Sequence, residues 1–234
     1  LLSWRYPVAG VLEIGIPGRS TYLMTAMLFS TPEVVAALLE AGACPKDTDI
    51  TGSDAFMSAC VLGRLGNVKV WLRKFPKWNV NRRNTRFGTA ALNLAAYMGP
   101  CKFELIKFLV EEADASVRCI SDNGANLLVM AAANLDADPK VIRYLLSRKD
   151  MYIYFAAKTL YRSGVSKTGL MEYLAMESGM TSLHCAARRG DVEIVEMLLE
   201  NGADPYVEND LDVNAFQVCE KFGPFPQVKS AIHS

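Results

Sequence analysis

Apolar residues recur at helical spacing in two short stretches of residues 181–205. Thr181 is a suitable N-cap for the first stretch, which ends at Gly190. Asp191 is a suitable N-cap for the second stretch, which ends at Gly202. The apolar face of the second stretch consists of Val192, Val195, Leu198 and Leu199. Isolated helices shorter than about 12–15 residues are marginal in water, so this helical hairpin must pack against neighbours to be stable.

Similar hairpins are predicted along most of the chain. Residues 21–45 align with residues 181–205 without a gap, and weaker copies begin at Asp54, Ala90 and Asn126. A shortened last copy begins at Asn214. From Thr21 onward, successive copies start 33, 36, 36, 55 and 33 residues apart. A fixed period of this size indicates a repeat architecture rather than a single globular core.

The T-x-L-H-x-A-A opening of residues 181–187 and the period near 33 resemble the ankyrin repeat. The resemblance covers about residues 18–232 and is strongest in the fifth copy. It implies an all-α ankyrin-repeat solenoid, with short β-hairpin fingers, about five full repeats and a C-terminal capping half-repeat. Copies two to four depart from the pattern, because Met57, Asn93 and Val129 occupy the position of His184.

The repeat boundaries predict five parts of the chain. Residues 1–17 form an N-terminal segment, either a cap on the first repeat or the end of a preceding domain. Residues 18–149 contain repeats one to four, residues 179–208 repeat five, and residues 209–234 the capping repeat. Residues 150–178 are an insertion of two short helices. This insertion is either an enlarged finger packed beside the repeats or an element that docks a partner.

Charge and cysteine usage restrict the possible functions. Lys+Arg and Asp+Glu both number 25, so no net positive charge favours nucleic acid or acidic membranes. No apolar run approaches the roughly 18 residues of a membrane span. The six cysteines have no regular spacing, and an intracellular, cytoplasmic location is expected. The chain starts with Leu and shows no signal segment, which predicts a piece of a longer protein.

Catalytic and metal-binding patterns are not found in the sequence. By resemblance, His184 is the repeat histidine that holds neighbouring turns by hydrogen bonds. Asn134, Asp136 and Asp138 have the spacing of a calcium loop. However, Pro139 and Leu145 occupy its glycine and glutamate positions. We therefore expect no enzyme activity, metal, cofactor or small-molecule substrate.

The remaining candidate function is protein binding. In the ankyrin family, partners usually contact the finger tips and the concave face formed by the first helices. The residues aligned with the pair before the mid-repeat glycine point to this face, and in the fourth copy they are Ala133 and Asn134. The pairs of the other copies, together with the second finger, give the predicted partner-binding set: Leu28, Phe29, Val61, Leu62, Arg82, Arg83, Arg86, Phe87, Tyr97, Met98, Arg188 and Arg189. Within this set, an apolar stripe flanked by the three arginines of the second finger has the composition of an interface hot spot: Phe29, Leu62, Phe87, Tyr97 and Met98. The alternative is that the extra loop residues of copies two to four bury these side chains locally.

The predicted fingers also differ in charge. The first contains Asp47, Asp49 and Asp54, whereas the last contains Glu208, Asp210 and Asp212. The second contains three arginines. This order either selects the charge of a partner or is scattered surface charge.

The predicted function is a non-enzymatic scaffold that binds another protein, with no nucleic-acid binding and no membrane insertion. The alternative is a regulatory or targeting arm of a larger enzyme, kinase or channel whose chemistry lies outside this segment.

Overall fold

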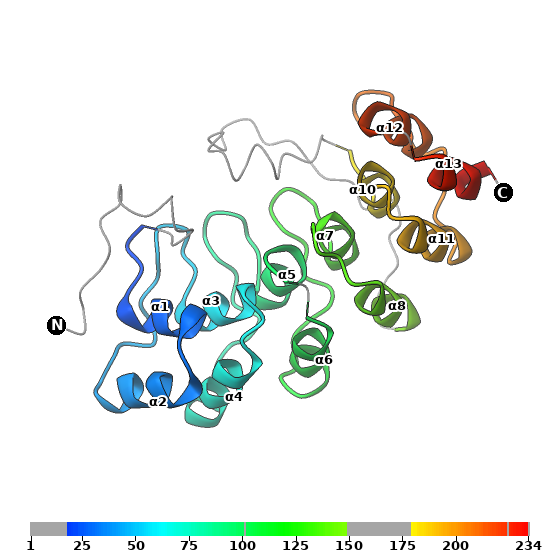
Figure 1. Ribbon diagram of the computed structural model, residues 1–234. Helices are drawn as coiled ribbons and strands as arrows, with labels where there is room; N and C mark the ends of the chain where they lie inside the picture. The colour runs from blue at the N-terminus through cyan, green and yellow to red at the C-terminus, as the bar shows by residue number, and fades with distance from the viewer. Residues whose placement is uncertain (1–17, 101, 149–178, 224, 234) are drawn as a thin grey trace. The chain divides into compact units, whose positions relative to one another are not determined.

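The computed structural model describes residues 18–100, 102–148, 179–223 and 225–233 (Figure 1). The predicted N-terminal segment, residues 1–17, and the predicted insertion, residues 150–178, lie outside these ranges.

The described residues form helices in consecutive pairs, which confirms the predicted all-α repeat architecture. The pairs are α1 (Tyr22–Phe29) with α2 (Pro32–Glu40), α3 (Ala55–Val61) with α4 (Leu65–Lys74), α5 (Ala91–Tyr97) with α6 (Phe103–Glu111), α7 (Leu127–Ala133) with α8 (Pro139–Ser147), α10 (Ser182–Arg189) with α11 (Val192–Glu200), and α12 (Ala215–Phe222) with α13 (Pro226–His233). The last copy, predicted as a capping half-repeat, therefore also contains a helix pair.

Polar side chains start most of the first helices at the predicted positions. The carboxylate of Asp54 accepts a hydrogen bond from the Met57 backbone N–H, 2.9 Å away. Asn126 caps α7 in the same way, by accepting from Val129 N at 2.9 Å. These residues replace the repeat threonine without loss of the cap, because Asp, Asn and Thr all accept hydrogen bonds from a helix N-terminus.

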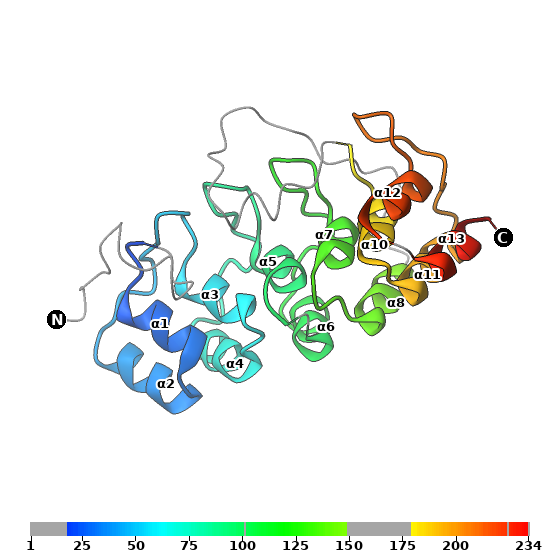
Figure 2. The ribbon, with the colours of Figure 1, turned by 45° about the horizontal axis from the view of Figure 1, so that its top comes forward.

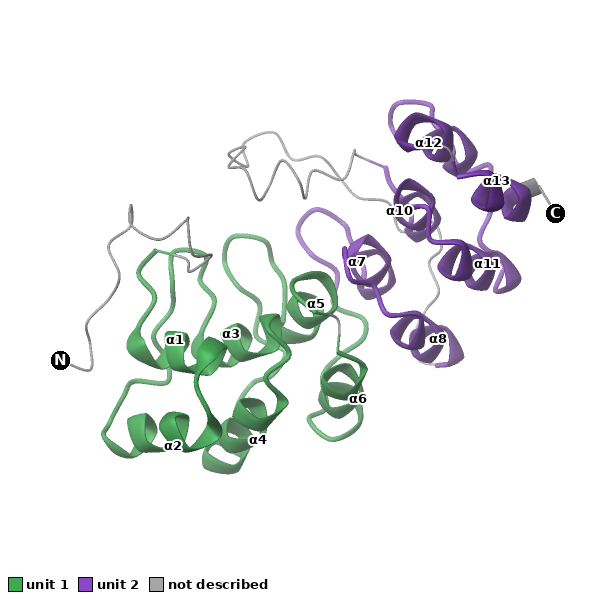
Figure 3. Ribbon diagram, in the orientation of Figure 1, with its two compact units in different colours: residues 1–119 green, residues 120–234 purple. Residues whose placement is uncertain are grey.

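The chain divides into two compact units, residues 1–119 and residues 120–234 (Figure 3). In unit 1, the first helices α1, α3 and α5 lie side by side, and each packs against the second helix of its own pair. In unit 2, α7, α10 and α12 form the corresponding row (Figure 2). Each hairpin is therefore stabilised by its neighbours within its unit, as a repeat protein requires.

The hydrophobic core lies between the two rows of helices in each unit. In unit 1 it includes Leu105, Ile106 and Leu109 on α6, which are almost fully buried. In unit 2, Ile194, Val195 and Leu198 on α11 are fully buried. Residues at i, i+1 and i+4 lie on one face of a helix, so this spacing directs the side chains inward. Of the apolar face predicted for the second stretch of residues 181–205, Val195 and Leu198 are fully buried, whereas Val192 and Leu199 are half-buried.

The fingers between consecutive pairs are loops that end in hydrogen-bonded turns. Asp49 N donates to Ser53 O at 2.9 Å, and Asn209 N donates to Val213 O at the same distance. Within the described ranges, the regular secondary structure is helical, and none of these fingers forms β-strands.

The repeat histidine has a counterpart in a copy that lacks it. His184 Nε2 donates to Val213 O at 3.0 Å, because a carbonyl can only accept, and Nδ1 then accepts from Thr181 N at 3.2 Å. In the third copy, Asn93 Nδ2 donates to Cys119 O at 3.2 Å. Its Oδ1 accepts from the backbone N–H of the residue at the N-cap of α5. The amide thus reproduces both hydrogen bonds of a neutral imidazole.

Candidate functional site

Apolar side chains gather at the C-terminal ends of α1, α3 and α5 in unit 1. Phe29 has 56% of its surface exposed, and Leu62, Tyr97 and Met98 are half-buried. With Val61, also half-buried, these residues form what we call the helix-end row. Exposed apolar patches often mark protein–protein interfaces, so this row is a candidate binding surface.

Leu28 does not belong to this surface, although the sequence placed it in the partner-binding set. Only 7% of its surface is exposed, so its side chain contributes to the core of unit 1. On a helix, adjacent residues point about 100° apart, which allows Phe29 to face solvent while Leu28 faces the core.

Close contacts between the short loops bring the helix ends together. Gly99 has a φ of 67° and packs on α3, where an added Cβ would lie 2.5 Å from Val61 O and 3.4 Å from Leu62 Cδ2. A side chain at position 99 would push the α5 end away from the α3 end. The glycine therefore keeps Met98 and Leu62 on neighbouring parts of one surface.

Side chains from the second repeat also cap the end of α1. Asn67 Nδ2 lies 3.0 Å from Met27 O and 3.1 Å from Ser30 O, and Arg64 Nη2 donates to Ser30 O at 3.0 Å. The last carbonyls of a helix have no partner within the helix, so these bonds satisfy groups that would otherwise need water. They also hold the loop after Phe29 in place.

Phe87 lies apart from the helix-end row. It precedes α5, which starts at Ala91, whereas Tyr97 is the last residue of that helix. Seven helical residues span about 10 Å, so Phe87 and Tyr97 lie at opposite ends of α5. The single apolar stripe expected from the sequence is therefore two surfaces, one at the helix ends and one at the fingers.

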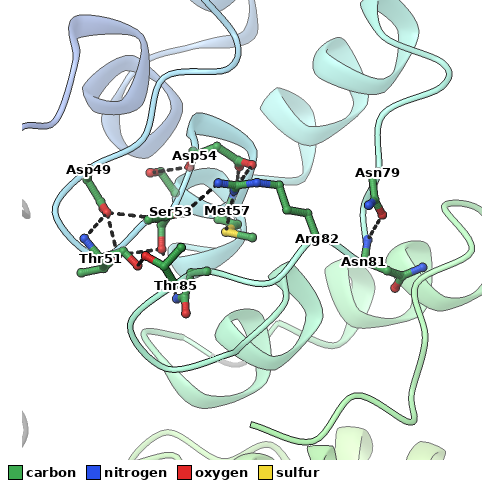
Figure 4. Close-up of polar contacts among 12 residues, drawn as sticks. Asp49, Thr51, Ser53, Asp54, Met57, Asn79, Asn81, Arg82 and Thr85 are labelled. Atoms are coloured by element: carbon green, nitrogen blue, oxygen red, sulfur yellow. Dashed lines mark hydrogen bonds and ion pairs between the residues drawn. The ribbon is translucent and has the colours of Figure 1, made fainter. Parts of the chain in front are cut away.

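Arg82 joins the first two fingers, residues 46–53 and 79–89 (Figure 4). Its Nη1 lies 2.8 Å from Asp54 Oδ2, and its Nη2 donates to Gly52 O at 2.9 Å. Asp54 is 2% exposed and also caps α3. Arg82 thus has a role within the fold, because it compensates a buried carboxylate.

The acidic residues of the first finger are mostly turned inward. Asp49 Oδ1 accepts from Thr51 N at 2.7 Å, Thr51 Oγ1 at 2.6 Å and Ser53 N at 3.0 Å (Figure 4). Burial raises the pKa of Asp49, and the bonds from Thr51 oppose this rise. Burial likewise raises the pKa of Asp54, opposed by its cap bond and by Arg82. The first finger is therefore not the acidic surface that its composition suggests.

Backbone and side-chain bonds align the two finger tips. Arg86 N donates to Thr51 O at 3.1 Å, and Thr85 Oγ1 donates to the same oxygen at 3.3 Å. Gly52, with a φ of 77°, permits this approach, since an added Cβ would lie 2.7 Å from Thr85 N. The tips form one ordered surface.

Both apolar and positively charged side chains reach the solvent on this surface. Ile50 is 39% exposed, and Arg83 is exposed with its Nε donating to Gly88 O. The Arg86 guanidinium lies over the ring of half-buried Phe87, 5.5 Å from the centroid. We call Ile50, Arg83, Arg86 and Phe87 the finger face.

In unit 2, the two predicted arginines make contacts within the fold. The Arg188 guanidinium lies 4.4 Å from the centre of the Phe222 ring. Arg189 Nη1 donates to Asn134 O, and also to Ala132 O at 3.3 Å, which caps the end of α7. Arg189 therefore caps the end of α7 as Asn67 caps the end of α1, although the two residues occupy different positions in their repeats.

The described residues do not include a cluster of three or more His, Cys, Asp or Glu side chains that could hold a metal ion. Cys60, Cys185 and Cys219 are buried and have free thiols. Burial raises the pKa of Cys185 to about 12, which makes this thiol a poor nucleophile. None of the described helices has the length and apolarity needed to cross a membrane.

Comparison with known proteins gives a consistent picture. The ankyrin repeat family matches residues 178–210. The ankyrin repeat and KH domain-containing protein mask-1 of Caenorhabditis elegans is 24% identical over 248 residues. The match covers 86% of this chain but only 9% of that protein.

Two solved structures share the fold. The ankyrin repeat domain of Bcl-3, a member of the IkappaB family, has a TM-score of 0.61 at 23% identity. That match covers 92% of this chain and 83% of the domain. A chain of the complex between endopeptidase Bd0816 of Bdellovibrio bacteriovorus and immunity protein Bd3460 has a TM-score of 0.65 at 23% identity, with coverages of 92% and 97%. The repeat match, the curated relative and these folds agree with the paired helices: residues 178–210 match the ankyrin repeat, and the chain shares the fold of ankyrin-repeat domains.

Proposed function

We propose that this chain is a non-enzymatic module that binds another protein, with the helix-end row of unit 1 as the main contact surface. The observation that carries the proposal is Phe29, a large aromatic side chain that is 56% exposed at the end of a packed helix. Leu62, Tyr97 and Met98 extend the apolar surface along the neighbouring helix ends. Aromatic and Met side chains are enriched at interfaces.

Contacts within unit 1 also hold the helix-end row in a fixed conformation, which supports its use as a binding surface. The bonds from Asn67 and Arg64 to Ser30 O and the contact of Gly99 with Val61 hold the three helix ends in place. Binding to a preorganised surface costs less conformational entropy than binding to a mobile one.

The similar proteins support a binding role without identifying a partner. Ankyrin repeats are protein–protein interaction modules, and one similar chain comes from a complex between an endopeptidase and an immunity protein. The intracellular location predicted from the cysteines remains a prediction.

Photocrosslinking tests the proposed surface. Benzoylphenylalanine at Phe29 or at Tyr97 is expected to form covalent adducts with a protein from the native cell extract. The matched control carries the same group at Lys77, an exposed residue after α4. Equal adduct formation at Lys77, or adducts at Tyr97 that persist unchanged in Phe29→Ser/Met98→Ser, would contradict the assignment.

A second candidate is that the chain is a regulatory or targeting arm of a larger protein. The match to mask-1 favours this candidate, because the aligned stretch covers only 9% of that much longer protein. Sequencing the complete reading frame on both sides of this chain separates the two functions, because an adjoining enzyme, kinase or channel domain would support the second.

A further inference from the structure

We infer that the finger face binds an acidic polypeptide segment that carries apolar side chains among its carboxylates. This inference rests on the proposed protein-binding function and adds the chemistry of the partner.

Charge complementarity is the first argument. Among the charged residues of the first two fingers, Asp49 and Asp54 are buried, and Asp54 is paired with Arg82. Asp47 and Arg86 are half-buried, whereas Lys46 and Arg83 are exposed, so positive charges outnumber negative ones on the solvent side of the fingers. Composition alone counts Asp49 and Asp54 as surface charge, whereas the structure places both in the interior.

The apolar residues between the arginines are the second argument. Ile50 is 39% exposed, and Phe87 lies beneath Arg86 with their groups 5.5 Å apart. A guanidinium stacked on an aromatic ring keeps its edge available for carboxylate oxygens while the ring offers an apolar contact. A segment that alternates Asp or Glu with Leu or Phe matches both features.

The rigidity of the surface is the third argument. Thr51 O receives bonds from Arg86 N and Thr85 Oγ1, and Asn84 Nδ2 donates to Ser53 Oγ at 3.2 Å. The positions of Ile50 and Arg86 are therefore coupled through the backbone. Fixed spacing between charged and apolar groups favours a partner of defined sequence.

A nucleic acid is a weaker match for the same arginines. Binding to a phosphate backbone relies on several cations along the path of the strand, and the chain has no net positive charge.

Selection from random peptides tests this inference. A phage-displayed library of random dodecapeptides is selected on the full chain, and the enriched sequences are compared with the starting library. We expect an excess of Asp and Glu together with Leu or Phe. Peptides from this pool should bind Arg83→Glu/Arg86→Glu about tenfold more weakly than the wild type in fluorescence anisotropy. High salt should weaken binding to the wild type and reduce the difference between the two proteins.

Charge exchange separates a lost contact from a damaged fold. Selected peptides with Lys in place of each acidic residue should bind the wild type poorly and Arg83→Glu/Arg86→Glu better. The matched control is Arg73→Glu/Lys74→Glu, which changes two exposed cations at the end of α4 and should leave binding unchanged.

Three outcomes would overturn the inference. These are an enriched pool without excess acidic residues, selected peptides that bind the double variant unchanged, and stronger binding of a twelve-residue oligouridylate than of any selected peptide. If adducts at Phe29 nevertheless form, the proposed protein-binding function stands and only the acidic partner is wrong.

Discussion

Arg82 reaches from the second finger to Asp54 at the start of α3, with Nη1 and Oδ2 2.8 Å apart. The carboxylate is buried and also caps the helix, so one ion pair connects a finger, a cap and the core. Removing one partner of such a pair leaves an uncompensated buried charge.

Arg82→Ala is therefore expected to lower the free energy of unfolding by about 2–4 kcal/mol in urea titrations. Arg82→Lys keeps the charge but not the forked geometry, and should cost about 1–2 kcal/mol. Lys77→Ala, at an exposed position, is the control and should have little effect. If Arg82→Ala unfolds at the same urea concentration as Lys77→Ala, the ion pair does not stabilise the fingers.

Asn93 gives a second prediction, because it replaces the repeat histidine. Asn93→Ala leaves Cys119 O and Ala90 N without their side-chain partners, at a cost of about 1–3 kcal/mol of unfolding free energy. Asn93→His should retain most of the stability, since His184 makes the equivalent two bonds in the fifth copy. Thermal unfolding by circular dichroism measures both. A histidine variant as unstable as the alanine variant would show that the two positions are not equivalent.

The separation of Phe87 from Tyr97 can be tested with single and double substitutions. Each side chain is half-buried, so each change to Ala should cost about 1 kcal/mol of unfolding free energy or less. Tyr97→Ala should weaken contacts of the helix-end row, Phe87→Ala those of the finger face, and the double variant should abolish partner capture.

The control for those variants is Leu109→Ala, which removes a fully buried side chain of the same unit. It should cost about 2–5 kcal/mol of unfolding free energy. If Phe87→Ala and Tyr97→Ala reduce the midpoint of unfolding as much as Leu109→Ala does, both residues belong to the core and the surface assignment is wrong.

The raised pKa of Asp49 predicts that the stability of the fold depends on pH. Burial raises its pKa above the ordinary value of 3.8, so the folded state holds the proton more tightly than the unfolded state. Its contribution to stability is fully present below pH 3.8 and is lost as the pH rises through the raised value. The free energy of unfolding of Asp49→Asn, relative to that of the wild type, should therefore increase as the pH rises across that window.

Asn can replace Asp49 without losing bonds, because Oδ1 accepts all three of them. The last finger already has Asn209 in the corresponding place, where Oδ1 accepts from Leu211 N at 2.9 Å and Val213 N at 3.1 Å. Urea titrations from pH 3 to pH 7 on both proteins provide the comparison. A constant difference across this range would mean that Asp49 titrates equally in both states.

The helices could be predicted from the sequence because their signals are local. Capping residues such as Asp54 and Asn126 stand at the expected starts, and the apolar positions of α6 and α11 have helical spacing. These signals depend on residues within a few positions of each other.

The surfaces were less predictable because they depend on contacts between repeats. The sequence showed three acids in the first finger, but only the fold places Arg82 beside Asp54. The sequence also predicts Leu28 beside Phe29 in the partner-binding set, although the helix points their side chains in different directions. Ile50 carries no signal in the sequence, because a single isoleucine in a polar loop has no distinguishing spacing.

The bonds from Asn67 to the end of α1 bear on how this chain can be engineered. The sequence period suggests that repeats are interchangeable modules, yet the cap of one repeat is supplied by a side chain of the next. A deletion or graft that ends between Ser30 and Asn67 would separate the helix from its cap. Shortened or chimeric versions should therefore be joined after α4, so that Asn67 stays with the carbonyls that it completes.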